Sequence, residues 1–315
     1  MKIVKLMNYN IAIDFLKHNF SSPTHWPDWN IVVSRYFQTN FFYFAAYKGK
    51  ELLGICPVHE VNDGWNSLLY SGQFHYIPYG GWIFNNCENF DFRFLSLEYR
   101  QMFSGFSLPL IPDFKASYSG KKIIKYYTLL IDLQKDEKEI WENELNYRRR
   151  RGIRKAERNM IQIVEASSGD FFEMFYSLYQ KAQERNKLLV LPKDFFIELL
   201  RSSTNIHYDL LLALKAEEAI SALAVAYDKN FAFFWLGMSV EHAPQFGQGE
   251  LLQWEAIKKA KALGCRYYDL CYIERERLPN IYEFKKGFSR NEVEISYFNI
   301  RPFVYRIFNR LHRWL

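Results

Sequence analysis

The feature that most constrains the fold of this chain is a strand, tight turn, strand pattern that occurs twice. The apolar runs of the first copy are Phe41–Tyr47 and Leu52–Val58, and those of the second are Tyr208–Leu214 and Ala219–Tyr227. Short apolar runs around a polar turn are typical of β-hairpins. The second turn, Lys215–Glu218, stands 167 residues after the first, Lys48–Glu51. We interpret the repeat as two related units; two generic hairpins that match by chance are the alternative.

Further elements can be placed around the hairpins by their apolar spacing and by the residues that break them. The expected strands are Ser67–Ser71, Lys121–Leu133, Phe231–Met238 and Cys265–Tyr272. The expected helices are Phe90–Phe103, Lys138–Asn159, Asp170–Asn186, Lys193–Arg201 and Glu250–Leu263, the last of them closed by Gly264. These elements predict an α/β (α+β) chain with mixed, mainly antiparallel sheets flanked by helices.

The length of 315 residues suggests two domains, because a domain has roughly 100–200 residues. We expect an N-terminal domain over residues 1–135 and a C-terminal domain over residues 136–300. Residues 301–315 have the pattern of a basic amphipathic helix. Such a helix can lie on an anionic membrane or dock on its own domain, and docking is the interpretation we favour.

The composition narrows the class of protein. The formal net charge of +6 favours anionic partners such as phosphates, nucleotides, RNA or acidic lipid head groups. The four cysteines have no CxxC spacing and the seven histidines no HxH or HxxxH spacing, so we expect reduced thiols and no metal. The sequence shows no signal-peptide pattern and no run of 18 apolar residues. We therefore expect a cytoplasmic protein. This expectation includes a protein that contacts the inner membrane surface peripherally.

A dense basic cluster lies between Arg148 and Arg158, with seven cations in eleven residues and only Glu157 of opposite charge. Like charges one turn apart destabilise a helix, so this density indicates a bound anion. We predict that Arg150 and Arg154 hold a phosphate of a substrate. The alternative is a solvated helix face that pairs with acidic residues elsewhere. Gly152 interrupts the cluster and is expected to bend the helix.

A second candidate site is the stretch from Gln245 to Gly249, which places two glycines just before a predicted helix. Backbone N–H groups at a helix N-terminus can hold a pyrophosphate, so Gln245, Gly247 and Gly249 are predicted cofactor-binding residues. An ordinary turn and cap is the alternative, and Glu250 would repel an anion there. The sequence has no GxSxG, GxxxxGK[ST] or full GxGxxG motif, which disfavours serine hydrolases, P-loop proteins and dinucleotide-binding domains.

The third candidate site follows the last predicted strand of the second hairpin series. Asp269 ends an apolar run, and Lys285 stands between aromatic residues, near what we expect to be a strand edge. A lysine in such a place can stabilise negative charge that develops on an acyl carbonyl. We add the neighbouring Tyr268 and Lys286 as predicted substrate- or phosphate-binding residues. A loop acid and a surface lysine are the plainer interpretations.

Four segments carry a resemblance to a known family. Glu250–Ala260, Leu263–Leu270 and Tyr282–Phe288 resemble the closing signature of FemAB-type transferases and of the GNAT proteins of polysaccharide and envelope gene clusters. Arg150–Arg158 resembles the Arg-rich helix that precedes the second domain of that family. The resemblance implies two tandem GNAT-like domains. It also matches Lys285 to the family lysine thought to assist transfer and Asp269 to an acid at the end of the preceding strand. Cys271 stands where the family usually has a glycine.

The resemblance implies the transfer of an acyl or aminoacyl group to an amine. Our leading hypothesis is an N-acyltransferase that takes the acyl group from acyl-CoA and places it on an amino group of a cell-envelope or surface-polysaccharide precursor. Asp269 would act as base and Lys285 would stabilise the oxyanion. A FemAB-type transferase that uses aminoacyl-tRNA is the alternative. A protein without catalysis, which binds an anionic ligand or a membrane surface, is the third hypothesis. The expected acceptor partner is a small-molecule or lipid-linked saccharide, with tRNA as a partner in the second case.

Overall fold

Both predicted hairpins are present, and they share a detail that the sequence did not reveal. In the first, β2 (Asn40–Lys48) pairs with β3 (Glu51–Asn62), and in the second, β9 (His207–Lys215) pairs with β10 (Glu218–Tyr227). Both hairpins have a two-residue turn and a shift of register one pair further along. The residue skipped at the shift is Leu53 in the first and Ile220 in the second, which are also 167 positions apart.

The computed structural model describes residues 2–62, 67–72, 77–85, 105–107, 123–202, 204–240, 246–272, 275–276 and 278–299. The chain divides into two units, and each contains one of the hairpins. Unit 1 comprises Met1–Tyr126 with Glu294–Leu315, and unit 2 comprises Tyr127–Val293. The boundary between units thus falls nine residues before the one expected from the sequence, and the last segment of the chain belongs to the first unit.

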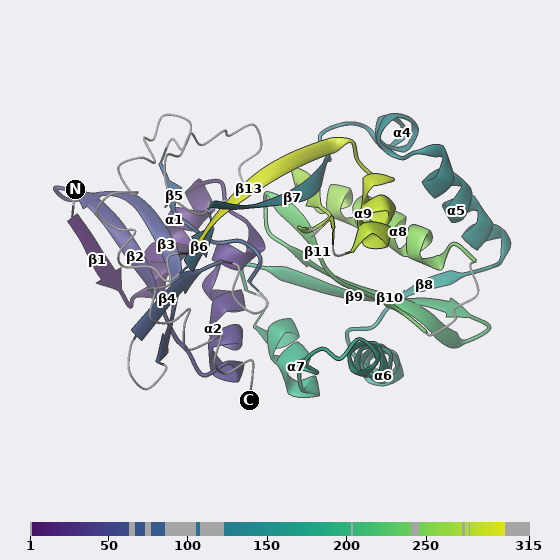
Figure 1. Cartoon of the computed structure of the whole chain (residues 1–315), viewed down its shortest axis with the longest axis horizontal. Coiled ribbons are helices and arrows are strands. Elements are labelled where there is room, and N and C mark those ends of the chain that lie inside the picture. The colour runs from purple at the N-terminus through teal and green to yellow at the C-terminus, as the bar shows by residue number, and fades with distance from the viewer. Residues whose placement is uncertain are drawn as a thin grey trace. The chain divides into compact units, whose positions relative to one another are not determined.

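Among the described residues, unit 1 is a sheet with the helices α1 and α2 beside the hairpin strands (Figure 1). Its strand order is β1-β2-β3-β4-β6-β13, and β5 pairs with β3. The strands other than the hairpin are β1 (Lys2–Leu6), β4 (Ser67–Ser71), β5 (Ile83–Phe84), β6 (Gly105–Ser107) and β13 (Asn291–Asn299), which begins in unit 2. The helices are α1 (Tyr9–His18), the short η1 (Pro23–His25) and α2 (Pro27–Tyr36). Asn8 caps α1 through its side chain, and Pro27 opens α2.

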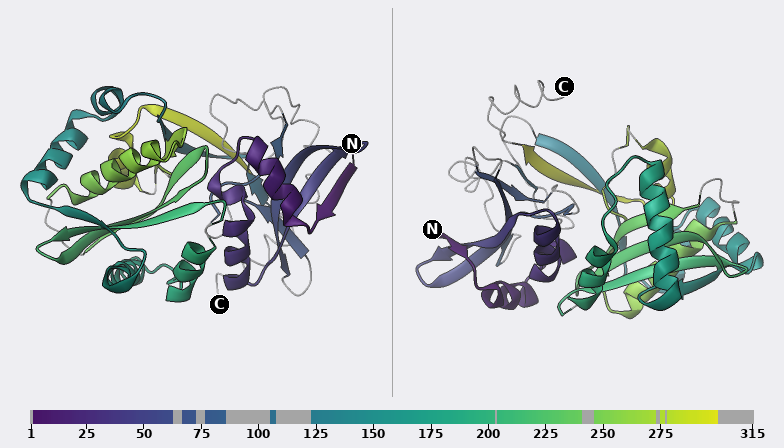
Figure 2. Two further views of the ribbon diagram at one scale, coloured as in Figure 1. Left: turned by 180° about the vertical axis from the view of Figure 1, so that it is seen from behind. Right: turned by 90° about the horizontal axis from the view of Figure 1, so that it is seen from below.

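Unit 2 is a sheet covered by helices on both faces (Figures 1 and 2). Its strand order is β7-β12-β11-β10-β9-β8, in which only β11 and β12 run parallel. The strands besides the hairpin are β7 (Ile123–Asp132), β8 (Gln162–Glu165), β11 (Phe231–Ser239) and β12 (Tyr267–Asp269). The predicted α/β (α+β) class with mainly antiparallel sheets is confirmed.

The helices of unit 2 divide between the two faces of its sheet. One face carries α6 (Gly169–Arg185) and α7 (Lys193–Arg201), and the other carries α5 (Tyr147–Arg158), α8 (Gln248–Ala262) and α9 (Pro279–Lys286) (Figures 1 and 2). The second group encloses a core that includes Ile153, Leu252, Ile257 and Phe288, together with residues of β9, β10 and β11. Gly264 has a φ of 80° just after α8, as expected of a glycine at that cap.

One predicted helix was wrong. The segment Lys138–Asn159 is not continuous: α4 (Glu137–Glu139) leads into a π-helical turn, η3 (Ile140–Glu144), and α5 begins only at Tyr147. Leu145 is extended and buried, and the Asn146 side chain accepts a hydrogen bond from the backbone N–H of Arg149. An asparagine that caps a new helix in this way competes with continuation of the old one.

Two predicted helices, Phe90–Phe103 and residues 301–315, lie outside the described residues. Within the described part of the chain, no helix combines the length and the apolar character needed to cross a membrane.

Candidate functional site

The candidate site lies where two strands of unit 2 stop pairing. β11 and β12 pair through three residues only, and the last pair is Phe233 with Asp269. β12 ends there, while β11 continues to Ser239 and contains a bulge at Trp235, which its neighbour β10 skips. A bulge bends a strand and often occurs beside functional sites. The backbone therefore brings the end of β12 close to Phe234 and to the loop that follows Asp269.

Asp269 is fully buried at this strand end and its position is fixed by its neighbours. Its Oδ1 accepts hydrogen bonds from Thr128 Oγ1 at 2.5 Å and from the backbone N–H of Cys271 at 2.9 Å. Cys271 has a φ of 60°, a left-handed conformation that favours glycine. This backbone conformation explains why a glycine is expected at the position of Cys271, because the chain turns there around the Asp269 carboxylate.

Lys285 reaches the same turn from α9. Its Nζ donates to the Cys271 carbonyl at 3.3 Å and lies 5.2 Å from the centre of the Phe234 ring, and the residue is 7% exposed. Burial lowers the pKa of the Lys285 ammonium, while the nearby Cys271 and Asp269 oppose that shift. The expected position near a strand edge was wrong, because Lys285 lies in the last turn of a helix. The structure nevertheless brings Lys285 and Asp269 to one backbone turn.

Arg149 is a residue of this region that the sequence analysis missed. Only 5% of it is exposed, although it lies in the basic cluster. Its Nη1 donates to Glu250 at 2.7 Å, its Nε to the Phe284 carbonyl at 3.1 Å and its Nη2 to the Glu283 carbonyl at 3.2 Å. The spacing of Arg149 from Ile153 and Ala156, both buried, would have identified it as the cation on the inner face of the helix.

The other predicted phosphate ligands have separate environments. The Nη1 of Arg150 donates to the carbonyls of Trp141, Glu142 and Leu145, so this half-buried guanidinium caps the end of η3. Arg154 is exposed and lies over the ring of Trp141, at 5.6 Å from its centre. The structure thus commits Arg150 to backbone carbonyls and leaves Arg154 on the surface.

Tyr268 and Lys286, the other two predicted substrate- or phosphate-binding residues, lie in different environments. Tyr268 is fully buried in the core of unit 2, and its hydroxyl accepts a hydrogen bond from Gln253 at 2.5 Å. This position contradicts direct contact with a phosphate, because strand alternation turns Tyr268 inward. Lys286 is exposed beside the Tyr282 ring.

The glycines before α8 serve the packing of helices. Gly247 caps α8 with a φ of 85°, and a Cβ there would lie 2.0 Å from the carbonyl oxygen of Gly152. A Cβ on Gly152 would in turn lie 2.7 Å from Glu250, so this glycine admits the close approach of α8, and α5 is continuous through it. A Cβ on Gly249 would come within 3.8 Å of the Phe284 ring, and Gln245 lies outside the described residues. Gly247 and Gly152 therefore have packing reasons for their identity, whereas a side chain on Gly249 would make only an ordinary contact.

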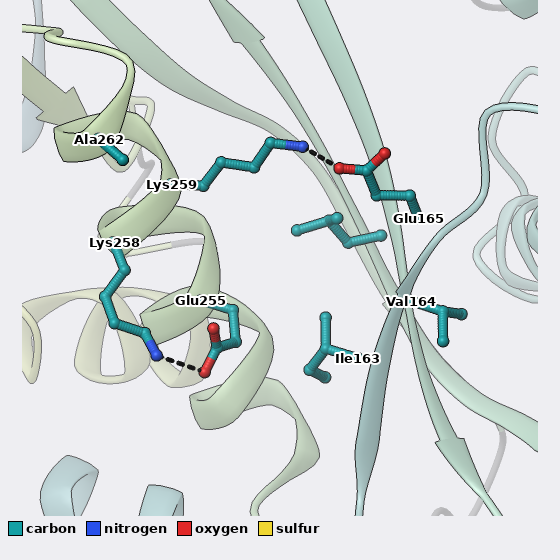
Figure 3. Close-up of a pocket in the computed structure, with 8 residues that line it drawn as sticks. Ile163, Val164, Glu165, Glu255, Lys258, Lys259 and Ala262 are labelled. Carbon is teal, nitrogen blue, oxygen red and sulfur yellow. Dashed lines mark hydrogen bonds and ion pairs between the residues drawn. The ribbon is translucent and has the colours of Figure 1, made fainter.

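The acidic, histidine and cysteine side chains of the described residues form no group of three or more that could hold a metal ion. A cavity of about 380 Å³ opens between β8 and α8, at the other edge of the sheet (Figure 3). Its floor includes Ile163, Val164 and Leu211, and its rim carries Lys259 bonded to Glu165. Lys259 also bonds the buried Asp209 at 2.9 Å, which ties α8 to the sheet. The predicted site residues that the structure describes do not line this cavity.

Comparisons with known proteins agree with this architecture. Residues 145–286 match the family model described as an acetyltransferase (GNAT) domain. Among solved structures, FemX has a TM-score of 0.69 at 12% identity, with 98% of this chain and 99% of that one covered. L-PGS from Bacillus licheniformis has a TM-score of 0.57 at 12% identity and covers 98% and 97%. A tandem GNAT protein from the clavulanic acid biosynthesis pathway has a TM-score of 0.53 at 10% identity, over 96% and 99%. No curated protein sequence matches.

The matched domain spans α5, α8, β12 and α9, and thus includes Arg149, Asp269 and Lys285. This match makes residues 145–286 similar to the acetyltransferase (GNAT) domain. The likeness to FemX, to L-PGS and to the tandem GNAT protein, at 10–12% identity, shows that the chain shares their fold.

Proposed function

We propose that unit 2 catalyses N-acyl transfer and that Lys285 is the residue that contacts the reacting acyl group. The observation that carries this proposal is the buried amine of Lys285, held at the turn where β12 ends. A buried, desolvated lysine has a cost in stability, and strongly perturbed groups of this kind are concentrated at functional sites. Its place within the matched GNAT domain supports the same assignment.

In the proposed reaction, the nitrogen of the acceptor amine attacks the acyl carbon of the donor. The C–N bond forms, the ester or thioester bond breaks, and the proton lost by the amine leaves with the departing oxygen or sulfur. The Lys285 ammonium donates a hydrogen bond to the carbonyl oxygen as negative charge develops there. Because burial lowers its pKa, Lys285 gives up a proton more readily than an exposed lysine does, so it can pass its proton to the leaving group and take up the proton that the amine loses.

We revise the role of Asp269 from that expected from the sequence. Its carboxylate is fully buried, and its Oδ1 is occupied by Thr128 and by the backbone of Cys271. A group in this position orients its neighbours more readily than it receives a proton from a bulky acceptor. We therefore propose that Asp269 fixes the turn at Cys271, and with it the carbonyl that holds Lys285.

The proposed acceptor is an amine on a cell-envelope or surface-saccharide precursor, as the resemblance to FemAB-type transferases implies. The likeness of the whole chain to FemX and to L-PGS supports this class. Arg154 and Lys286 are the candidate ligands for an acceptor phosphate, because both side chains are exposed.

The donor we favour is an aminoacyl-tRNA. After Arg149 and Arg150 are committed to internal contacts, α5 still presents five exposed cations, Arg148, Arg151, Arg154, Lys155 and Arg158. Four of them are three or four residues apart, which places them along one side of the helix, where a nucleic-acid backbone could lie. At the N-terminus of α8, by contrast, the Arg149–Glu250 ion pair and the close contact of Gly247 with Gly152 disfavour a pyrophosphate.

Acyl-CoA is the second candidate donor, and the GNAT domain match favours it. A binding experiment separates the two. We expect the purified chain to retard aminoacyl-tRNA in a gel, with affinity that falls steeply between about 50 and 200 mM salt. Replacing Arg148, Arg151 and Arg158 by glutamine should flatten that salt dependence. A rise in melting temperature with acyl-CoA and no retardation of tRNA would assign the donor to acyl-CoA instead. Absence of acyl transfer with either donor would overturn the proposal.

A further inference from the structure

Arg149 joins three helices of unit 2 through one buried guanidinium. It lies on α5, bonds Glu250 in the first turn of α8, and bonds the carbonyls of Glu283 and Phe284 in the last turn of α9. Burying a charge is costly unless its hydrogen bonds are satisfied. Here all three nitrogens of the guanidinium donate to an acceptor, so the burial is compensated only in this arrangement of α5, α8 and α9.

Helix α9 depends on such a contact because little else stabilises it locally. It has eight residues, and an isolated helix of that length is unstable in water. Its N-cap residue, Leu278, makes no side-chain capping bond. At the other end, the backbone N–H groups of Gly287 and Phe288 donate to the carbonyls of Phe284 and Lys285, at 3.2 and 2.9 Å. Arg149 adds hydrogen bonds to the Glu283 and Phe284 carbonyls, and its charge complements the helix dipole.

The chain after α9 is shaped to admit the guanidinium. A Cβ on Gly287 would lie 2.5 Å from Arg149 Nε and 2.7 Å from its Cγ, so a larger residue would displace the side chain. The Phe284 ring lies 4.4 Å from the guanidinium carbon and the Phe288 ring 5.8 Å. The backbone N–H of Asn146, three residues before Arg149, donates to the Gly287 carbonyl at 2.8 Å. Arg149 is therefore enclosed by the segment that carries Lys285.

We propose that Arg149 is the positioning residue that holds α9, and through it the amine of Lys285, against the turn at Cys271. The proposal rests on the catalytic role of Lys285 proposed above and adds a residue to which neither the sequence analysis nor the comparisons assign a role. Arg149 itself contacts backbone carbonyls and Glu250, so it acts through Lys285.

The charged and titratable groups around this pair are few. Asp269 on β12 and Cys271 in the loop after it act on Lys285. Glu250 on α8, Glu283 on α9 and Arg148 on α5 act on Arg149. A change at Arg149 should therefore reach Lys285 by moving α9, because Lys285 would gain contact with water.

The test is the titration of Lys285 in the full chain. The titration is measured by labelling the protein with an amine-specific reagent over a range of pH and quantifying the labelled peptide by mass spectrometry. In the unchanged protein Lys285 should titrate below an ordinary lysine. In Arg149→Gln its pKa should rise toward the ordinary value. Arg149→Lys, which keeps the charge without the fork of donors, should fall between them.

Arg150→Gln is the matched control. Arg150 is the next residue in the chain, and its replacement also removes a guanidinium bonded to three carbonyls. These carbonyls lie at the end of η3 and not in α9. Both variants should lower the melting temperature, and only Arg149→Gln should move the titration of Lys285. The double variant Arg149→Gln with Glu250→Gln should show the same rise, because the effect comes from α9 and not from an unpaired Glu250.

An Arg149→Gln protein that folds and keeps the wild-type titration of Lys285 would overturn the proposal. If that variant does not fold, a wild-type titration of Lys285 in Arg149→Lys would overturn it equally. Because the labelling uses no acyl donor or acceptor, it is independent of the proposed function. Once the donor is known, Arg149→Gln should reduce kcat by about 100-fold and change KM much less, as expected when a reacting group is misplaced.

Discussion

The two units share a hairpin with the same register and bulge, yet they bury different kinds of polar side chain. In unit 1 the buried polar residues are mostly uncharged. His25, for example, lies 2.9 Å from the Ser22 hydroxyl through Nδ1 and 3.1 Å from the Gly80 carbonyl through Nε2. His59 lies 2.9 Å from the Asn30 side chain. Networks of this kind, satisfied by protein groups, rigidify a core.

In unit 2 the described residues bury several charged groups as well as uncharged ones, and the charged ones include Arg149, Asp209, Asp269 and Lys285. A buried charge is far more costly than a buried amide or hydroxyl, and it is retained where it has a structural or chemical use. The comparison teaches that the shared hairpin is a scaffold. The chemistry proposed for unit 2 uses β12 and α9, which come after the hairpin, together with Thr128 of β7 and Arg149 of α5, which come before it.

The largest expected effect is on catalysis in unit 2. Replacing Lys285 by methionine removes the donor to the developing oxyanion and should reduce turnover by about 100- to 1,000-fold. The fold should survive, because methionine fills a similar volume without a desolvated charge. Steady-state kinetics and the melting temperature check both statements. His25→Gln, a buried substitution in unit 1, should lower stability and leave the turnover of folded protein unchanged. Full activity of Lys285→Met would contradict the catalytic role proposed for Lys285 and, with it, the difference proposed between the two units.

The next largest effect concerns the pH dependence of unit 1. Burial lowers the pKa of His25 to about 4, from an ordinary value of 6.5. Because the folded pKa is depressed, the unfolded chain binds the proton first. The contribution of His25 to the free energy of unfolding is therefore fully present above about pH 6.5. It is lost as the pH falls toward 4, and the loss reaches about 3 kcal/mol.

Urea unfolding at several pH values between about 7.5 and about 4.5 measures this loss. The variant His25→Gln should be less stable at neutral pH and should depend less on pH in this range. The exposed His18 provides the control, since His18→Gln should keep the wild-type slope. An unchanged slope in His25→Gln would show that another group of the chain causes the acid sensitivity.

A smaller effect should distinguish the turns of the two hairpins. The first turn uses Gly49 at a φ of 61°, whereas the second places Ala216 and Glu217 at 48° and 69°. A residue with a side chain is strained in this conformation by about 1–2 kcal/mol. Gly49→Ala should therefore destabilise the protein by about 1 kcal/mol, although no atom lies near the new methyl group. Glu217→Gly should stabilise it by about 0.5–1 kcal/mol. A stabilising Gly49→Ala or a destabilising Glu217→Gly in denaturant unfolding would contradict the assigned turn conformations.

The smallest effect is expected at the candidate site. Cys271 is a residue with a side chain at a φ of 60°, so Cys271→Gly should relieve strain and stabilise unit 2 by about 0.5 kcal/mol, the entropy of the glycine being subtracted. Cys271→Ala, which keeps the strain, is the matched control and should show no gain in the same denaturant unfolding measurement. Destabilisation by glycine would mean that the thiol itself has a packing role.

Much of the fold could be predicted because it depends on local patterns. The hairpins, α6, α7 and α8 follow from apolar spacing and from turn residues, which act over a few positions. The Lys138–Asn159 helix was wrong because a side-chain cap at Asn146 and the burial of Leu145 outweigh helical periodicity there. In the same way, Gly247 fits a phosphate loop as a pattern, while its packing against Gly152 depends on a helix almost one hundred residues away.

The sequence by itself determined the repeated hairpin and the order of the elements in unit 2, and it pointed to Asp269, Lys285 and the arginines of α5 as candidate site residues. Only the tertiary structure decided which of those arginines turns inward and that Lys285 belongs to a helix. It also decided that Tyr268 is a core residue. The physical reason is that hydrogen-bonded turns and amphipathic spacing are set by neighbours in the chain. The burial of a charge depends on partners such as Glu250 and the carbonyls of α9, which are more than one hundred residues away from Arg149.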